Sequence, residues 1–570
     1  MNIFFTLKKQ LQKKQILYLS ILIFLMIFIS IFEMIGLGSV PILLGSILKQ
    51  NYLVESTNIE FLKNFFNETS QKNQIIYLSI FIVTFFLFKN VYQAFVVYVQ
   101  GQITKGIKIY FSRKLFNFYV NQDYLFLIKK NSSIIIRTIS TDIANTTRYI
   151  LSLLNLSREM LILIAIFSLL LISNPQITLF IFSVFLTIVS LFYFFNKKNI
   201  LFRGKIIQKL TSDMIKVIYE TIGMFKELKI YNIGKYQKDL FFKKINISEI
   251  NVFKNYFIQS LPKLFLELAA IFLIVTIILF YVVNDKNIFD LLPFLSLLVV
   301  VSLRLIPIFN GIATSLGSMR STKPSFNLVM SELSDSDKYL EKYKEINYLE
   351  FNDEIKLDNI SFKYSEDDKL IINNLSLKIK KGDKIGIIGE SGSGKTTLIN
   401  LIMGLFKITN GNIFVDGNQL SNKKYNIIKN IGYVPQEINL VENTIGKNIA
   451  IGLNDNEISL TKLKEASSSA QILDFILKLD EKFDTKVEEK GNNFSVGQKQ
   501  RIGVARALYR SPNLLILDES TSSLDSKTEQ NFINDIFEFN KEKTIIFISH
   551  RASSLSKCNK IFDIKKNKFI

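Results

Sequence analysis

Nine consecutive residues have the types and spacing needed to bind phosphate. They are Gly389, Glu390, Ser391, Gly392, Ser393, Gly394, Lys395, Thr396 and Thr397, and the first eight match the pattern G-x-x-x-x-G-K-[ST] in full. Glycines let the backbone turn tightly, so that N–H groups face phosphate oxygens, and a following helix adds the positive end of its dipole. Lys395 can reach the β- and γ-phosphates, and the Thr396 hydroxyl can bind Mg²⁺. These residues predict a nucleoside triphosphate site.

The elements around this stretch are those that the chemistry requires. Apolar residues at 384–388 predict a strand before the loop, and those at 398–403 predict a helix after it. Later strands are predicted to end at Asp518 and before His550, the only histidine in the chain. Asp518 is then placed to reach Mg²⁺, and Glu519 beside it to polarise an attacking water as general base. A lone histidine is usually structural, but at this sheet edge we interpret His550 as a γ-phosphate contact.

Three other stretches carry polar or aromatic candidates. Gln436 follows a short predicted strand and a proline, so it is expected in a loop. Tyr364 lies 25 residues before Gly389, where its ring could stack on an adenine, although an ordinary strand aromatic would look the same. Residues 494–501 are a largely polar stretch ahead of a predicted helix at 502–509. The candidate site therefore draws on distant parts of the chain.

Composition and charge divide the 570 residues into two unlike parts. Long apolar runs fill the first 320 residues or so, whereas the remainder has the composition of a soluble domain. The net charge is +17 over residues 1–350 and +4 over 351–570. Because the excess lies in the apolar part, it indicates loops facing the cytoplasm and anionic lipid, not nucleic acid, although a general richness in Lys contributes. The single cysteine, Cys558, excludes an intrachain disulfide.

Six segments are long and apolar enough to span about 30 Å of hydrocarbon: 16–48, 75–99, 153–173, 177–195, 257–283 and 289–316. The basic stretches 101–152 and 197–256 are predicted to be cytoplasmic, as are both termini. Helical apolar spacing within these stretches predicts that the spanning helices extend well into the cytoplasm. The first apolar run is too long for the core of a cleavable signal, and no small-residue cleavage site follows it.

Charged residues inside these segments are further candidates. Glu33, Lys89 and Arg304 lie within the first, second and sixth segments, and Lys263 and Glu267 flank the start of the fifth. A charge near the membrane centre costs roughly 2.5–3.5 kcal/mol on insertion scales, so each is expected to face a cavity or a partner. Lys89 could instead snorkel to an interface, and Lys263 with Glu267 could be a structural i,i+4 ion pair. Arg304, well inside an apolar run, would suit an anionic head group such as a phosphate.

In motif order and spacing, residues 351–570 resemble the nucleotide-binding domain of ABC transporters. The resemblance implies these roles: an adenine-stacking Tyr364, a Q-loop Gln436 that takes part in catalysis and reaches Mg²⁺, a Walker B Asp518, a catalytic Glu519, a D-loop at 522–525 and a switch His550. It also implies that Ser495, Gly497 and Gln498, in the signature motif, contact ATP held by a second copy. The implied cofactors are ATP and Mg²⁺.

The signature motif departs from the family pattern. Phe494 stands where the family usually has Leu, Val496 where it has Gly, and upstream Glu488 where exporters often have Gly. A β-branched residue is disfavoured at positive φ, so Val496 is expected to slow closure if its position needs such a backbone. We therefore expect reduced but real ATPase activity.

The apolar part resembles the membrane domain of exporter-type ABC proteins. We expect an all-α transmembrane domain of six helices over 1–325, a linker over 326–350, and an α/β P-loop nucleotide-binding domain with a helical subdomain over 351–570. One nucleotide-binding domain per chain implies a homodimer in the bacterial inner membrane, with two ATP sites and alternating openings. Short coupling helices would lie near 121–133 and 221–235.

The membrane part looks most like flippases for lipid-linked oligosaccharides in bacterial protein glycosylation, on the residues Pro262, Lys263 and Glu267 and the stretch from Arg304 to Asn310. That resemblance implies that Lys263 and Arg304 hold the pyrophosphate of the lipid. Gly311 stands where a second basic residue might be expected. An exporter of another lipid or of a peptide is the main alternative, and an ATP-gated channel or regulator is a third hypothesis.

Overall fold

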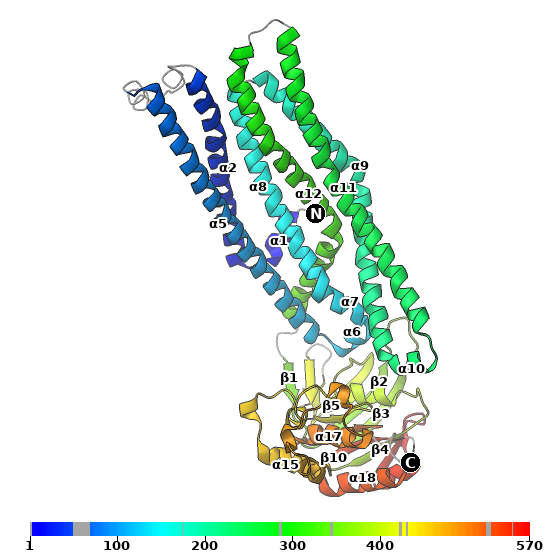
Figure 1. The fold of residues 1–570 in the computed structure, drawn as a ribbon. Helices are drawn as coiled ribbons and strands as arrows, with labels where there is room; N and C mark the ends of the chain where they lie inside the picture. Colours follow the sequence, from blue (N-terminus) through cyan, green and yellow to red (C-terminus); the bar gives the residue numbers. More distant parts are fainter. Residues whose placement is uncertain are drawn as a thin grey trace. The chain divides into compact units, whose positions relative to one another are not determined.

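The computed structural model describes residues 3–48, 69–173, 175–283, 288–342, 346–420, 425–428, 431–519, 526–549 and 551–570. The chain forms two compact units (Figure 1). Unit 1 comprises Met1–Asn121 and Lys130–Tyr339, and unit 2 comprises Gln122–Lys129 and Leu340–Ile570. The boundary near Tyr339 falls inside the predicted linker. The short segment Gln122–Lys129 belongs to unit 2 although it lies between helices of unit 1 in the sequence.

Unit 1 is helical throughout its described part. Its helices are α1 (Ile3–Gln10), α2 (Lys13–Leu48), α5 (Gln71–Val120), α7 (Ser132–Arg137), the π-helical turn η1 (Thr138–Asp142), α8 (Ile143–Ser173), α9 (Pro175–Gly223), α10 (Phe225–Ile230), α11 (Gly234–Val283) and α12, which spans Ile288–Lys342 and so continues past the boundary. Five helical segments within the described residues are long and apolar enough to cross a membrane. The sixth predicted span lies in α12, where many side chains are outside the described residues.

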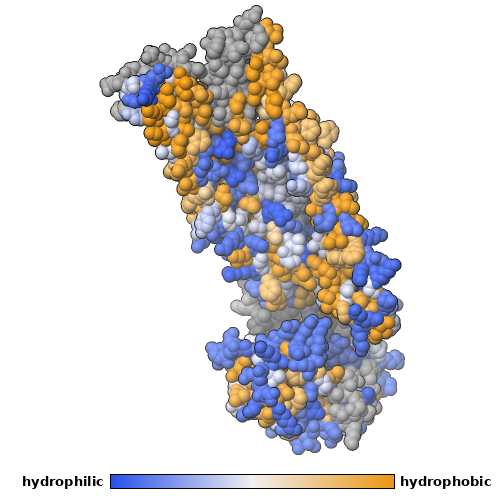
Figure 2. All heavy atoms as spheres, viewed as in Figure 1, coloured by the Kyte–Doolittle hydropathy of each residue, from blue (hydrophilic) through white to orange (hydrophobic). Residues whose placement is uncertain are grey.

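The long helices confirm that the predicted spans extend beyond the bilayer. Helices α5 and α11 have 50 residues each and α9 has 49, or roughly 75 Å at 1.5 Å per residue, against about 30 Å of hydrocarbon. Apolar side chains such as Phe24 and Val83 are exposed, at 59% and 67%, and Figure 2 shows hydrophobic residues over the surface of these helices. Such a surface is typical of one that is covered by lipid or by another protein.

Aromatic rings and one glycine bring helices of unit 1 together. Phe185 of α9 stacks on Phe309 of α12, with 5.2 Å between ring centroids. Further along α9, a Cβ added to Gly204 would lie 2.3 Å from the carbonyl oxygen of Ser321 in α12. The absence of a side chain at Gly204 therefore allows the two helix backbones to touch.

Unit 2 contains two principal sheets. The six-stranded sheet has the order β12-β11-β4-β10-β9-β8, and its pairs are parallel except β11 with β12. Its strands are β4 (Lys384–Ile388), β8 (Ile431–Val434), β9 (Leu514–Asp518), β10 (Thr544–Ile548), β11 (Lys560–Asp563) and β12 (Lys568–Phe569). Because β4, β8, β9 and β10 run parallel, their carboxyl ends share one edge, where ligands bind in open α/β sheets.

The second principal sheet is antiparallel, with the order β3-β2-β5-β6. Its strands are β2 (Glu354–Phe362), β3 (Ile372–Lys380), β5 (Asn410–Val415) and β6 (Asn418–Gln419), and β1 (Ile346–Leu349) pairs separately with β7 (Tyr425–Ile428). The helices of unit 2 are α6 (Tyr124–Lys129), α13 (Lys395–Ile402), α14 (Ile445–Ile449), α15 (Leu460–Ser469), α16 (Leu473–Leu477), α17 (Val496–Leu508) and α18 (Ser526–Phe539).

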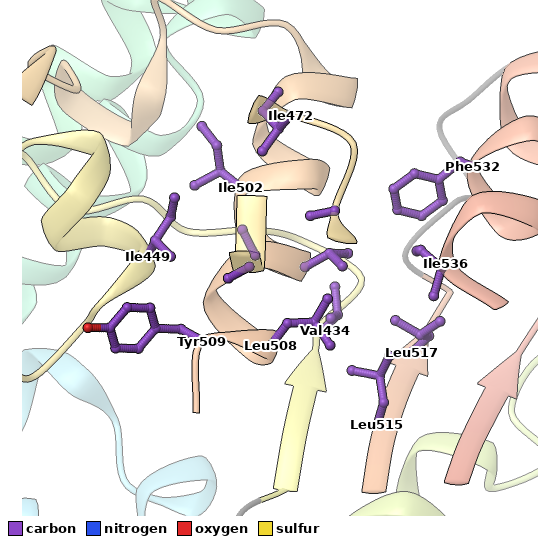
Figure 3. Close-up of a cluster of buried hydrophobic side chains, with 14 of the residues drawn as sticks. Val434, Ile449, Ile472, Ile502, Leu508, Tyr509, Leu515, Leu517, Phe532 and Ile536 are labelled. Carbon is purple, nitrogen blue, oxygen red and sulfur yellow. The ribbon is translucent and has the colours of Figure 1, made fainter. Parts of the chain in front are cut away.

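A hydrophobic cluster joins the parallel sheet to the helical subdomain (Figure 3). Val434 of β8 and Leu517 of β9 lie on one side of it, Ile502 of α17 lies on another, and all three are at most 1% exposed. The predicted α/β domain with a helical subdomain is therefore confirmed, as is the helical membrane domain that precedes it.

Substitution of Gly204 tests the contact between α9 and α12. We expect Gly204→Ala to lower the midpoint of thermal unfolding in detergent micelles, by an amount that corresponds to roughly 1–3 kcal/mol, because backbone atoms of Ser321 must move. Gly106→Ala is the matched control, since a Cβ there has nothing within 4 Å. Equal midpoints for the two variants would contradict the close approach.

Candidate nucleotide-binding site

The phosphate loop connects β4 to α13 and is built on glycines that no other residue replaces easily. Gly392 and Gly394 have φ of 80° and 93°, in the left-handed region that favours glycine. Gly394 caps the N-terminus of α13. A Cβ added to Gly389 would lie 2.5 Å from the Ser393 hydroxyl oxygen. The loop therefore turns tightly and presents the helix N-terminus, as an anion site requires.

Lys395 is folded over this loop. Its Nζ donates hydrogen bonds to the carbonyl oxygens of Gly389 at 2.9 Å and Glu390 at 3.1 Å, and it lies 3.9 Å from Oε1 of Glu519. Among the described residues, the Ser393 hydroxyl is buried without a hydrogen-bond partner. A largely buried ammonium group and an orphaned hydroxyl beside a helix N-terminus fit a phosphate group.

A pocket of about 370 Å³ adjoins the same loop. Residues of the loop itself line one part of it, including Glu390 and Ser393, and Ile372, Ile564 and Lys565 line the rest. The phosphate loop is therefore open to a ligand.

The predicted catalytic carboxylate and glutamine meet at the shared strand edge. Nε2 of Gln436 donates to Oε2 of Glu519 at 3.0 Å, and Glu519 follows β9 directly. The backbone of Glu519 has φ of 47°, which is uncommon for a residue other than glycine and is often found at functional sites. The structure therefore brings Lys395, Gln436 and Glu519 together, as expected from the sequence.

Asp518 is the last residue of β9 and is 4% exposed. Burial raises the pKa of this carboxyl, whereas hydrogen bonds from the Tyr433 and Thr396 hydroxyls favour its ionised form. Asp518, Thr396 and Gln436 offer the oxygen ligands that Mg²⁺ prefers, and one or two protein ligands suffice when phosphates and water supply the rest. The residues present fit the predicted metal ion, which would neutralise charge on the phosphates.

Tyr433 is a functional candidate that the sequence analysis missed. Its hydroxyl donates to Oδ2 of Asp518 at 3.3 Å, and burial followed by the Asp518 charge raises the pKa of Tyr433. Tyr433 pairs with Ile516 in the parallel register of β8 and β9. In the sequence, Tyr433 could have been noticed because it lies three residues before Gln436. Its contact with Asp518, however, becomes apparent only from the pairing of β8 with β9.

Tyr364 lies beside the helix that follows the phosphate loop. Its hydroxyl is 2.9 Å from the Thr397 hydroxyl, and its ring meets those of Phe362 and Phe406 edge-on at 5.1 and 5.6 Å. The ring is therefore fixed near the loop, where stacking on a base is geometrically possible.

The signature stretch begins α17. Ser495 is the N-cap, its hydroxyl accepts from the Gln498 N–H, and Oε1 of Gln498 accepts from the Ser495 N–H. Val496 and Gly497 are the first helical residues, and Val496 is not among the residues with positive φ. The condition under which Val496 is expected to slow closure, a backbone with positive φ, is not met in this structure, and the expectation of reduced ATPase activity stays a prediction. Contacts of Ser495, Gly497 and Gln498 with ATP on a second copy remain a prediction.

Two predicted elements lie outside the described residues: His550 and the D-loop at 522–525.

In unit 1, the two predicted substrate cations each have a carboxylate partner. Nζ of Lys263 lies 3.7 Å from Oε1 of Glu267, and both side chains are about half exposed. Arg304 binds Glu33, which also accepts from Nζ of Lys89 at 2.9 Å. Lys89 is 2% exposed, so it does not snorkel but completes a buried cluster.

Removing the Tyr433 hydroxyl tests its role in positioning Asp518. We expect Tyr433→Phe to weaken binding of Mg²⁺–ATP by roughly three- to tenfold, about the net effect of one hydrogen bond. Binding of ATP with excess EDTA should not change, because Asp518 acts through the metal. The matched control is Tyr509→Phe, which removes a hydroxyl that accepts from the Ser459 N–H in the helical subdomain. If Tyr433→Phe lowers the affinity for ATP equally with and without Mg²⁺, this role is contradicted.

Comparison with known proteins finds similar sequences for part of unit 2 and, at lower identity, for most of the chain. Residues 372–522 match the model of the ABC transporter family. The ATP-dependent lipid A-core flippase of Haemophilus influenzae is 36% identical over 212 residues, which is 37% of this chain and 36% of the relative. The flippase of the same description in Aliivibrio fischeri is 26% identical over 490 residues, or 83% of this chain and 81% of the relative.

A solved structure extends the likeness to both units. It is described as a bacterial Atm1-family ABC exporter with ATP bound, and it covers 97% of this chain and 94% of its own, with a TM-score of 0.73 at 19% identity. The first two curated relatives are matched over only 36% and 38% of their length. Unit 2 contains the residues that match the ABC transporter family and has the α/β fold expected of an ABC ATPase domain, and unit 1 contains helices long and apolar enough to cross a membrane. The chain therefore resembles ABC transporters in sequence over part of unit 2, and shares its overall fold, at 19% identity, with the solved exporter structure.

Proposed function

We propose that this chain is an ATP-driven exporter or flippase that works as a homodimer by alternating access in the bacterial inner membrane, with both termini in the cytoplasm. Its substrate is amphipathic, a lipid-linked oligosaccharide or a similar glycolipid. The observation that carries the ATP-driven part is the convergence of Lys395, Gln436 and Glu519 at one sheet edge, in a chain that also has membrane-spanning helices.

Hydrolysis follows from the positions of these side chains. Glu519 takes the proton of a water that attacks the γ-phosphorus, and Gln436 holds the Glu519 carboxylate by a hydrogen bond of 3.0 Å. Lys395 stabilises negative charge on the phosphates, and the loop N–H groups bind their oxygens. The products are ADP and inorganic phosphate. His550 is proposed to contact the γ-phosphate.

Dimerisation supplies the rest of each ATP site in this proposal. Ser495, Gly497 and Gln498 at the start of α17 bind the ATP that Lys395 of the other copy holds. ATP then favours the closed pair through contacts that the open pair lacks, and hydrolysis removes them.

Helices α6 and α10 lie within the two stretches near 121–133 and 221–235 that are predicted to hold coupling helices, and we propose them for that role. Tyr124 of α6 stacks on Phe406 at 5.8 Å between ring centroids, and Asp123 forms an ion pair of 2.8 Å with Lys407. The short helix α10 has exposed apolar side chains, among them Phe225 at 57% and Ile230 at 66%. We propose that α10 binds the ATP-binding domain of the second copy, which would bury those side chains.

Charges within the membrane support an anionic head group. The cluster of Glu33, Lys89 and Arg304 has two cations for one carboxylate, and the Arg304 side chain is 37% exposed. Arg304 thus keeps some access to a phosphate, whereas Lys263 is balanced by Glu267 within its own helix. Lys263 and Arg304 remain the proposed pyrophosphate contacts, with Arg304 the better supported.

A cavity lined by several polar side chains offers space for the head group. It has a volume of about 480 Å³ and is lined by residues of α8, α9, α11 and α12, including Arg148, Gln208, Asn255 and Ser321. Asn255 is 5% exposed, and neither of its amide atoms has a hydrogen-bond partner among the described residues. Hydroxyl groups of a sugar can donate to and accept from such an amide.

The alternatives differ in what they require. An exporter of another lipid or of a peptide would use the same ATP site with different cavity contacts. An ATP-gated channel would not need the general base, so the position of Glu519 beside Lys395 favours a pump.

Steady-state ATP hydrolysis tests the ATP-driven part. We expect the purified chain to hydrolyse ATP, and Glu519→Gln to lower the rate by at least about a hundredfold while ATP binding persists, because the amide cannot accept the proton. Glu465→Gln, which changes an exposed carboxylate in α15, is the control. Hydrolysis that survives Glu519→Gln would contradict the assigned base.

Translocation in liposomes tests the substrate. A short-chain lipid-linked oligosaccharide should cross only with ATP, and Arg304→Ala should slow it about tenfold or more, as expected for a lost charge-assisted contact. Lys338→Ala removes a side chain that is 77% exposed beyond the predicted spans and should have no effect. If Arg304→Ala and Lys263→Ala both transport normally, the pyrophosphate contact is wrong. Transport of other lipids in place of this substrate would favour the main alternative.

A further inference from the structure

Phe406 stands between α6 and the proposed base site. Its ring stacks on Tyr124 at 5.8 Å and 18°, and on Phe362 at 5.2 Å and 3°, while Tyr364 meets it edge-on at 5.6 Å. Phe406 is 3% exposed, so these rings largely enclose it. One side chain therefore contacts both the coupling helix and the tyrosine that is proposed to stack on adenine.

Both ends of this ring stack are anchored. On one side, the Phe406 N–H donates to the carbonyl oxygen of Asn400 in α13 at 3.3 Å, and the Tyr364 hydroxyl is 2.9 Å from that of Thr397 in the same helix. On the other side, the ion pair of Lys407 with Asp123 holds the start of α6. A displacement of either ring system is expected to move Phe406 as well, because a close-packed interior leaves little free volume around a buried ring.

We propose that Phe406 couples occupation of the base site at Tyr364 to the docking of α6. A base stacked on Tyr364 limits the motion of that ring, which holds Phe406 in the position that stacks on Tyr124. Thermodynamic coupling is reciprocal, so docking of α6 raises the affinity for the base by the same factor by which a bound base favours docking of α6. This inference rests on the proposed ATP site, and it adds a route from the base to the membrane domain that does not pass through the phosphates.

A double-mutant cycle on the full-length chain tests the coupling, in a Glu519→Gln background that prevents hydrolysis. Affinities are measured for ATP and for inorganic tripolyphosphate, which has no base. We expect Tyr124→Leu and Phe406→Leu each to lower the affinity for ATP by about two- to tenfold, which is the range expected for the loss of one aromatic contact. The double variant should be no weaker than Phe406→Leu alone, because both changes break one path. Tripolyphosphate affinity should not change in any variant.

Three controls separate coupling from loss of structure. Tyr124→Phe retains the ring and should bind ATP as the parent does. Ile128→Ala changes a 52% exposed residue of the same helix, and Phe562→Leu changes an equally buried ring of the same hydrophobic core; neither should weaken ATP. Additive losses, equal losses for tripolyphosphate, or a loss in Tyr124→Phe would each overturn the coupling. Failure of the parent chain to bind ATP would instead overturn the proposed ATP site itself.

Discussion

Parallel pairing of four strands is the constraint on which the ATP site depends. Strands β4, β8, β9 and β10 pair in parallel, so the residues that follow them reach the same edge although they are far apart in the sequence. The phosphate loop, Gln436 and Glu519 meet only for this reason. A strand reversal or a register shift by one residue would turn these side chains away from one another.

At the same edge, a buried lysine, Lys395, lies near two acidic residues, Asp518 and Glu519. Lys395 is 5% exposed and Asp518 is 4% exposed, and a charge at such depth is stable only with partners. Loop carbonyls, Glu519, Tyr433 and Thr396 supply those partners. In unit 1, Glu33 has a similar role, because it forms ion pairs with Lys89 of α5 and Arg304 of α12.

A short segment that lies between helices of unit 1 in the sequence folds with unit 2. Residues Gln122–Lys129 join unit 2 because Tyr124 and Leu125 find apolar partners there that six residues of helix could not provide alone. The stack through Phe406 then connects α6 to the tyrosine of the proposed base site, within a single hydrophobic core.

The sequence by itself determined the domain order, the long apolar helices, and the positions of the phosphate loop, Gln436, Asp518 and Glu519. These features depend on local patterns: apolar periodicity, glycines at tight turns, and polar residues at strand ends. Only the tertiary structure decided the contact of Tyr433 with Asp518, the pairing of Lys89 and Arg304 with Glu33, the helical backbone at Val496, and the place of Phe406 between two tyrosines. Each of these depends on which elements lie side by side, and residue spacing along one chain does not encode a distance between strands or helices that are far apart in it.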